Sequence, residues 1–377
     1  MSKELNEIAK DLKKANKKVQ LIYAFNGTGK TRLSRAFKEL VAPKDDAQEE
    51  GDGESGQQTS LSRHKILYYN AFTEDLFYWD NDLEGDAEPK LRIQPNTFTD
   101  WILKVQGQEA KITKIFQRYS NDKLTPNFSQ DFSHVTFSFE RGNAEKEPNV
   151  KISKGEESNF VWSIFHGLLE QVIRVLNNPE EEDGDEFQQL EYVFIDDPVS
   201  SLDENHLIEL AVNLAELIRT SPDKLKFVIS THNPLFYNVL HNELNKKTCY
   251  LLQKFEDGSF ELKEKQGGAN TSFSYHLYIK QLIEKAISDN EVQRFHFNLL
   301  RNLYEKVAAF LGYSDWTALL PENRELYAKR VMHFYSHRSL SNEEVAEPTE
   351  PEKQTVKFLL EHLLNNYGFK LQGEANA

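Results

Sequence analysis

The sequence predicts an α/β protein with a mostly parallel sheet, followed by a mostly α-helical domain. Between residues 19 and 262, short β-like runs alternate with helical stretches, which is the pattern of strands joined by crossover helices. After residues 267–270 the β-like runs stop and the pattern becomes helical. We therefore expect one domain over residues 1–266 and a second over residues 267–377. The β-like runs are VQLIYAF, HKILYYNAF, EYVFIDD, LKFVIST and CYLLQKF.

Composition limits the class of protein. A chain of 377 residues has room for two or three domains, and 39% hydrophobic residues suffice for a sizeable core. No apolar run reaches the ~20 residues of a membrane span, and the single cysteine, Cys249, suits a reducing compartment. We expect a soluble, cytoplasmic protein.

The net charge of −15 argues against a general nucleic-acid coat, because phosphate binding needs a basic surface. Much of the acid, however, lies in two runs, residues 44–60 and 177–186, which lack large apolar side chains. Residues 280–340 are nearly neutral in net charge, so the composition does not exclude a local basic cleft in that region. The basic residues of that region include Arg301, Arg324, Lys329, Arg330 and Arg338.

A glycine-rich turn, AFNGTGKT, follows the first predicted strand and precedes a helical pattern. Backbone N–H groups in such a turn converge on a phosphate, with a helix N-terminus behind them. Lys30 would reach the β- and γ-phosphates of a nucleotide, and the Thr31 hydroxyl would bind Mg²⁺. Ala24 stands where this motif usually has glycine, and the alternative is an ordinary strand–turn–helix corner. The expected nucleotide-binding residues are Asn26, Gly27, Thr28, Gly29, Lys30, Thr31 and Arg32.

Two adjacent carboxylates end another predicted strand. Asp196 and Asp197 follow the apolar run YVFI, so Asp196 would lie at the carboxyl edge of the sheet, beside phosphate-bound Mg²⁺. We expect Thr31 and Asp196 to hold the metal, and Asp197 to polarise the water that attacks the nucleotide. Taken alone, the pair has an alternative interpretation, because aspartate is a frequent helix N-cap.

Three further segments resemble motifs of ABC-type ATPases. SSLD, residues 200–203, resembles the D-loop, and His232, after the run FVIST, resembles the switch histidine that contacts the γ-phosphate. ISKGEES, residues 152–158, stands in the place of the signature motif, which binds the nucleotide of the opposite subunit. The five motifs in this order favour an ABC-type P-loop ATPase domain that forms at least a homodimer. The expected signature residues are Ser153, Lys154, Gly155 and Glu156.

An amphipathic helix is predicted over residues 295–311, with one apolar stripe along it. Arg301 and Glu305 lie one turn apart on the opposite side. From spacing alone they form an exposed ion pair worth ~0.3 kcal/mol, and His337 is an ordinary surface histidine. The residues of the apolar stripe are Leu300, Leu303, Val307 and Phe310.

Segments across nearly the whole chain are similar to those of one family. They are VQLIYAFNGTGKTRLS, ILYYNAFTEDLFYWDND, SKGEESNF, YVFIDDPVSSLD, RNLYEK and the tail NNYGF. By these segments the chain resembles the PrrC family of anticodon nucleases. The resemblance implies an NTPase that controls a C-terminal ribonuclease, which nicks the anticodon loop of a tRNA, typically tRNA-Lys. It also implies a nuclease triad of Arg301, Glu305 and His337, with His333 and Arg330 in reserve in an HEPN-like pattern.

These residue types suit RNA cleavage without a metal ion. The 2′-hydroxyl of the RNA would attack the adjacent phosphorus, leaving a 2′,3′-cyclic phosphate and a 5′-hydroxyl. Arg301 would bind the phosphate and stabilise its growing charge. Glu305 and His337 would carry the protons, and the sequence leaves open which of them is the base. Aromatic residues placed to stack on bases are Tyr304, Phe334 and Tyr335.

The resemblance extends to cofactors and partners. It implies ATP or GTP with Mg²⁺, dTTP as an effector, a homodimer or higher homo-oligomer, and silencing by a type I DNA restriction–modification complex. The segment KQGGANTS, residues 265–272, would contribute to tRNA recognition or serve as a plain linker. The rival hypothesis is a nucleotide-switched binding protein whose C-terminal helices only dock a partner.

Overall fold

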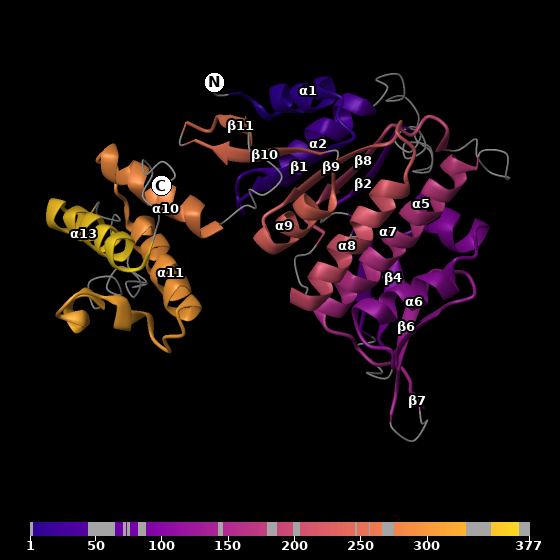
Figure 1. Cartoon of the computed structure of the whole chain (residues 1–377). Helices are drawn as coiled ribbons and strands as arrows, with labels where there is room; N and C mark the ends of the chain where they lie inside the picture. The colour runs from indigo at the N-terminus through magenta and orange to yellow at the C-terminus, as the bar shows by residue number, and fades with distance from the viewer. Residues whose placement is uncertain are drawn as a thin grey trace. The chain divides into compact units, whose positions relative to one another are not determined.

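The computed structural model consists of two compact units, Met1–Phe273 and Ser274–Ala377 (Figure 1). Each unit has its own hydrophobic core. No helix among the described residues is long and apolar enough to cross a membrane. The structure describes residues 3–43, 65–70, 73, 76–81, 88–141, 146–178, 187–198, 204–245, 247–255, 257–265, 275–328 and 348–368.

Six strands form the main sheet of the first unit, in the order β11-β10-β1-β9-β8-β2. All neighbouring pairs are parallel except β10 and β11, which confirms the expected mostly parallel α/β sheet. The inner strands β1, β8 and β9 are almost wholly buried, and their sequences are accordingly continuous apolar runs. Their carboxyl ends meet at one edge of the sheet. The strands are β1 (Val19–Ala24), β2 (Ile66–Tyr69), β8 (Tyr192–Asp196), β9 (Lys226–Thr231), β10 (Lys247–Lys254) and β11 (Phe260–Glu264).

Helices pack on both faces of this sheet (Figure 1). The central strand β1 alternates between the two faces, because successive side chains of a strand point in opposite directions. Ile22 and Ala24 belong to a core shared with helices α1 and α2. Tyr23 packs edge-on against Tyr237 of helix α9, with ring centroids 5.7 Å apart. The helices of the sheet are α1 (Leu5–Ala15), α2 (Lys30–Val41), α7 (Lys154–Asn177), α8 (Glu204–Thr220) and α9 (Pro234–Glu243).

A second, antiparallel sheet, which the sequence patterns did not indicate, precedes α7 in the chain. Its strands are short, and β4 (KLRI) and β5 (LTPNF) carry charged residues and a proline that obscure the alternation of apolar residues. Phe116 of α6 joins this sheet to α7, since its ring contacts both Phe137 of β6 and Phe160 of α7. The elements of this region are β3 (Phe77–Asp80), β4 (Lys90–Ile93), α5 (Thr97–Thr99), the π-helix η2 (Asp100–Val105), α6 (Glu109–Tyr119), β5 (Leu124–Phe128), β6 (His134–Glu140) and β7 (Lys146–Glu147).

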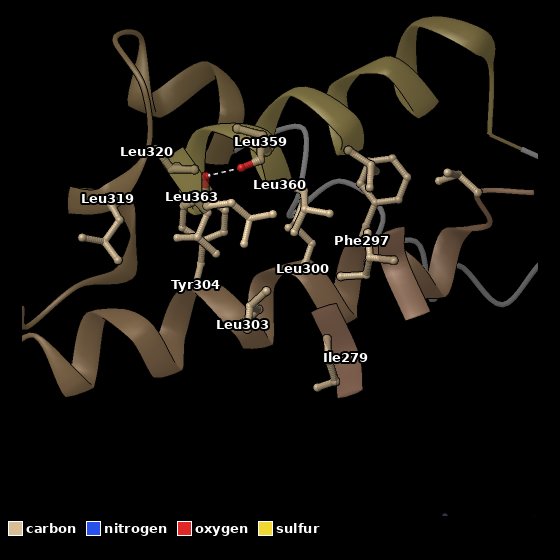
Figure 2. Packing of buried hydrophobic residues seen from close by; sticks show 14 of the residues in the cluster. Ile279, Phe297, Leu300, Leu303, Tyr304, Leu319, Leu320, Leu359, Leu360 and Leu363 are labelled. Carbon is tan, nitrogen blue, oxygen red and sulfur yellow. Dashed lines mark hydrogen bonds between the residues drawn. The ribbon is translucent and has the colours of Figure 1, made fainter. Parts of the chain in front are cut away.

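The described part of the second unit is helical, as expected, with one core between its helices (Figure 2). Leu300 and Leu303 of α11 are fully buried there, but Phe310 is 90% exposed, so its predicted place in the apolar stripe is wrong. Phe310 is the last residue of α11, where the helix has passed beyond the core. The elements are α10 (Tyr275–Ser288), α11 (Arg294–Phe310), the 3₁₀-helix η4 (Trp316–Leu319) and α13 (Glu350–Asn366).

Candidate nucleotide site and candidate nuclease residues

The glycine-rich turn lies between β1 and α2, at the carboxyl edge of the main sheet. Gly27 and Gly29 have φ angles of +78° and +100°, a conformation that side-chain-bearing residues rarely adopt. A Cβ atom at Gly29 would also lie 3.3 Å from Cε1 of Phe260. Ala24 needs no such freedom, because it is the last residue of β1 and pairs with Leu252 in the sheet. The departure from the usual motif at Ala24 therefore leaves the turn intact.

Lys30 is the first residue of α2, and its side chain folds back over the turn. It is only 7% exposed. Its Nζ atom donates hydrogen bonds to the backbone oxygen of Ala24 at 3.4 Å and to Oδ1 of Asn26 at 3.2 Å. A cation held at the centre of a turn with a helix N-terminus behind it forms an electropositive cradle that suits a phosphate group.

Asp196 ends β8 and is surrounded by hydroxyl groups. Thr31 donates to its Oδ2 atom at 2.7 Å, and Ser230, at the end of β9, donates to its Oδ1 atom at 2.6 Å. Burial, partly offset by these hydrogen bonds, raises the pKa of this carboxyl. The oxygen atoms of Thr31 and Asp196 form the hard donor set that Mg²⁺ prefers, beside the phosphate cradle, so these residues fit the expected metal.

Asp197 connects the lysine to the candidate switch histidine. Its Oδ2 atom lies 3.3 Å from Nζ of Lys30 and 2.5 Å from Nδ1 of His232. Burial alone would raise the pKa of Asp197, but the hydrogen bond with His232 and the charge of Lys30 outweigh it and lower the pKa. Neither carboxylate caps α8, because that helix begins only at Glu204. The structure thus brings Lys30, Thr31, Asp196, Asp197 and His232 together.

The candidate signature residues form the first turn of α7, where Ser153 and Lys154 are exposed and Gly155 and Glu156 are half-buried. Ser153 is the N-cap, with Oγ accepting from the Glu156 backbone N–H at 3.3 Å, while Oε2 of Glu156 accepts from the Ser153 backbone N–H at 2.7 Å. Lys154 pairs with Glu157. Among the residues that the structure describes, no hydrogen bond or ion pair joins residues 153–156 to Lys30 or its neighbours. The D-loop candidate, residues 200–203, lies outside the described residues.

The candidate nuclease residues of the second unit are only partly described. Arg301 donates from Nε to Oε1 of Glu305 at 2.7 Å, and its guanidinium lies 5.8 Å from the ring centre of Trp316. Tyr304, expected to stack on a base, is only 1% exposed and donates to the backbone oxygen of Leu359 at 2.8 Å, so that expectation is wrong (Figure 2). The residues that lie outside the described range are Arg330, His333, Phe334, Tyr335 and His337.

Sequence reasoning missed several polar residues around the phosphate cradle. Ser230 is one, and a second group consists of Ser34 and Tyr68, beside Asn70. The hydroxyl groups of Ser34 and Tyr68 lie 2.6 Å apart, and Asn70 donates to Tyr68 at 2.6 Å. Burial raises the pKa of Tyr68 to about 12. The available signal was a polar residue at or just after the carboxyl end of a buried strand, as in FVIST and ILYYN.

Comparisons with known proteins support a family assignment. The AAA domain family matches residues 101–364. A protein from Escherichia coli named anticodon nuclease is 59% identical over an alignment of length 398, covering 100% of both chains.

Solved structures show only weak similarity to this chain. The dimeric post-hydrolysis state of the ATP-binding cassette MJ0796, bound to ADP and Pi, is 13% identical with a TM-score of 0.34, and covers 67% of this chain and 87% of that chain. The SMC head domain from Thermotoga maritima is 13% identical with a TM-score of 0.30, and covers 66% and 91%. Scores this low support no inference about function or assembly.

Proposed function

Because this chain belongs to the family of anticodon nucleases, we propose that it is a latent ribonuclease that nicks a tRNA in its anticodon loop under the control of its own nucleotide-binding domain. The observation that carries this proposal is the 59% identity with the Escherichia coli anticodon nuclease over the full length of both chains. The cluster around Lys30 and the Arg301–Glu305 pair support it.

The first unit is proposed to bind and hydrolyse ATP or GTP. Lys30 and the backbone of residues 26–32 would bind the phosphates, and Thr31 and Asp196 would hold Mg²⁺, which supplies charge neutralisation when bound. Asp197 would orient the attacking water, with His232 fixed beside it by their hydrogen bond. An incoming phosphate would replace Asp197 as the partner of Lys30.

We propose an ABC-type homodimer as the active arrangement. Ser153, Lys154, Gly155 and Glu156 lie at the N-terminus of a 24-residue helix, which carries partial positive charge and backbone N–H donors. Ser153 and Lys154 are exposed, Gly155 and Glu156 are half-buried, and among the described residues no hydrogen bond or ion pair joins this turn to the phosphate cradle of its own chain. Both properties suit a group that binds the γ-phosphate held by a second subunit.

The second unit is proposed to cut RNA through Arg301, Glu305 and His337. The 2′-hydroxyl loses its proton and attacks the adjacent phosphorus, the bond to the 5′-oxygen breaks, and that oxygen gains a proton. Arg301 would bind the phosphate through its guanidinium, whose Nε atom is fixed by Glu305. Glu305 and His337 would act as the proton carriers. The products would be a 2′,3′-cyclic phosphate and a 5′-hydroxyl.

A nuclease of this kind must be silent in the absence of a trigger. We propose that a type I DNA restriction–modification complex silences it, that nucleotide hydrolysis in the first unit releases the nuclease, and that dTTP is an effector. This silencing is tested by purifying the chain together with such a complex. Adding nucleotide should then release the complex from the chain.

The proposal is tested by incubating the full chain with total tRNA and ATP or GTP, then sequencing the RNA ends. The expected result is one nick in one anticodon loop, of tRNA-Lys next to the wobble base, since loops present unstacked bases that proteins read by sequence. A Lys30→Ala variant is the matched control and should not be activated by nucleotide. Cuts scattered through stems, or 5′-phosphate ends, would contradict the proposed reaction.

A further inference from the structure

The strand β3 of the second sheet contacts the beginning of α7. Alternate residues of a strand point to the same side, and residues three apart lie on one face of a helix, so the two elements can meet at two successive points. The rings of Phe77 and Phe160 pack edge to face, with centroids 6.3 Å apart. Nε1 of Trp79 donates a hydrogen bond to Oε2 of Glu157 at 2.8 Å. The first two turns of α7 are therefore attached to β3 by one apolar contact and one polar contact.

Glu157 directly follows the candidate signature turn, residues 153–156, and is only 8% exposed. Its other carboxylate oxygen, Oε1, accepts from Nζ of Lys154 at 2.8 Å. The Lys154 side chain is 83% exposed, and ion pairs with so much solvent around them contribute little. The bond from Trp79 is partly buried and has a charged acceptor, which makes it the stronger of the two. Trp79 is thus the main contact that fixes the Glu157 side chain.

The chain on the other side of the turn is attached to the same tryptophan. Lys151 lies two residues before the turn, and its Nζ atom is 5.7 Å from the centre of the Trp79 ring. The same atom donates to Oδ1 of Asn81, the residue after β3, at 2.7 Å. Trp79 itself is held in the sheet, because β3 pairs with β4 and its ring packs against Phe137 of β6 at 6.2 Å. One anchored indole ring therefore contacts the chain both before and after the signature turn.

We propose that Trp79 is a positioning residue for the signature turn and sets the direction in which that turn faces the nucleotide of a second subunit. This inference rests on the proposed ABC-type homodimer. The capping box between Ser153 and Glu156 fixes the local shape of the turn but not its direction relative to the sheet. The contacts of Trp79 on both sides of the turn fix that direction. Because hydrogen bonds to a phosphate weaken steeply with distance and angle, a turn that could tilt would bind the γ-phosphate of the second subunit more weakly.

The test measures nucleotide hydrolysis by the full chain as a function of chain concentration, since a shared site forms only when two chains meet. Trp79→Phe keeps an aromatic ring in the sheet but removes the N–H donor. The chain concentration for half-maximal hydrolysis should rise about tenfold, the factor that corresponds to the loss of a hydrogen bond to a charged acceptor, and the rate at saturating concentration should recover. Binding of a fluorescent nucleotide to the cradle around Lys30, measured at low chain concentration, should be unchanged.

Trp101→Phe is the matched control. Trp101 is a buried indole in η2, and its Nε1 atom has no hydrogen-bond partner among the residues that the structure describes. The same substitution there removes packing but no hydrogen bond, so the unfolding midpoint should fall while the concentration dependence of hydrolysis stays that of the wild type. Both variants are assayed below their unfolding temperatures. If Trp79 served stability alone, the two variants would behave alike.

Two further variants test the remaining contacts. Lys151→Gln changes an exposed residue, so folding is not at risk, and should raise the half-maximal concentration about threefold, the order of an exposed cation–π contact. Glu157→Gln should shift it in the same direction. The double variant Trp79→Phe/Glu157→Gln should lose less than the product of the two single effects, because both substitutions act through the same bond.

The outcomes distinguish this inference from the proposed function. A wild-type half-maximal concentration in Trp79→Phe, an equal shift in Trp101→Phe, or fully multiplicative effects of Trp79→Phe and Glu157→Gln would each overturn the role of Trp79 and leave the homodimer standing. Hydrolysis by the wild-type chain that did not depend on its concentration would instead contradict the homodimer itself.

Discussion

Asp197 is the residue that links the parts of the candidate nucleotide site. Its carboxylate contacts both Lys30 and His232, the two groups expected to bind the γ-phosphate. Its φ angle is +53°, a conformation that costs on the order of 1–3 kcal/mol in a residue other than glycine. Strain of this kind persists where the surrounding contacts fix it. Here the Thr231 hydroxyl and the His232 backbone N–H donate to the Asp197 carboxylate, and the Asp197 backbone N–H donates to the Ser230 carbonyl.

An Asp197→Asn substitution should separate nucleotide binding from hydrolysis. Removing the charge leaves Lys30 free for phosphate, so binding should be retained or tightened. Hydrolysis should fall by ~10²–10⁴-fold, the usual contribution of a positioned proton acceptor. Binding is measured with a fluorescent nucleotide and hydrolysis by phosphate release. Asp223→Asn, at an exposed aspartate, is the control and should behave as wild type; unchanged hydrolysis in Asp197→Asn would remove this residue from the mechanism.

The same carboxylate predicts a pH dependence of stability. Its pKa is lowered from the ordinary 3.8, because its bonds with His232 and Lys30 outweigh burial. A carboxylate with a lowered pKa stabilises the folded state above its ordinary pKa, and this stabilisation is lost as the pH falls through the folded value. The difference in unfolding free energy between wild type and Asp197→Asn should therefore be full at neutral pH and shrink below about pH 4. Denaturation curves at several pH values measure this difference. A free-energy difference that increased at acidic pH would contradict the expected direction of the pKa shift.

Tyr304 gives a prediction for the second unit. Its ring is buried, and its hydroxyl donates to the backbone oxygen of Leu359, joining α11 to α13. Tyr304→Phe would remove this bond between the helices, while the Leu359 carbonyl keeps its donor within α13, and should destabilise the unit by ~0.5–1.5 kcal/mol. Tyr313→Phe, at a residue 48% exposed, should change stability little. Equal unfolding midpoints of the two variants in urea would show that the hydrogen bond contributes nothing.

At the scale of elements, the sequence predicted the main sheet well because its inner strands are buried on both faces. YVFID and KFVIST have few structural interpretations other than a buried strand. Their polar last residues, Asp196, Ser230 and Thr231, lie at the candidate nucleotide site. The second sheet was not predictable in this way, since KLRI and LTPNF are short and contain charged residues and a proline rather than a continuous apolar run. Tyr304 was misjudged because α13 packs over its side of α11, and Phe310 because α11 has passed beyond the core at its last residue.

The first turn of α7 carries a prediction at this scale. Ser153→Arg should leave nucleotide binding intact, because no hydrogen bond or ion pair joins this turn to the phosphate cradle of its own chain within the described residues, but should abolish hydrolysis by blocking the proposed dimer. Loss of the N-cap alone costs ~1 kcal/mol of helix stability, so Ser153→Asn, which keeps a capping side chain, is the control. Nucleotide-dependent dimerisation is measured by light scattering. A Ser153→Arg variant that still dimerised and hydrolysed would argue against a shared site.

At the scale of the whole molecule, the residues proposed for nucleotide hydrolysis and those proposed for RNA cleavage belong to different units. The proposed NTPase residues belong to Met1–Phe273, whereas Arg301 and Glu305 belong to Ser274–Ala377. Spacing alone did not distinguish Arg301 and Glu305 from an ordinary surface ion pair, and their geometry is compatible with one, at 2.7 Å and an i,i+4 separation. Their assignment as nuclease residues therefore depends on family resemblance and on His337, which lies outside the described residues.

This separation leads to the last prediction. Because the two sets of residues lie in different units, His337→Ala should eliminate RNA cleavage and leave nucleotide hydrolysis at the wild-type rate. Asp197→Asn should instead lose hydrolysis and, with it, the cleavage that hydrolysis is proposed to release. Cleavage by the activated protein should also continue in EDTA, since the proposed reaction uses Arg301, Glu305 and His337 rather than a metal ion, whereas hydrolysis should stop. End-labelled tRNA and phosphate release measure the two activities in one sample. If EDTA stopped cleavage itself, a metal-dependent nuclease would replace the His337 mechanism, and if His337→Ala stopped hydrolysis as well, the two units would not be chemically independent.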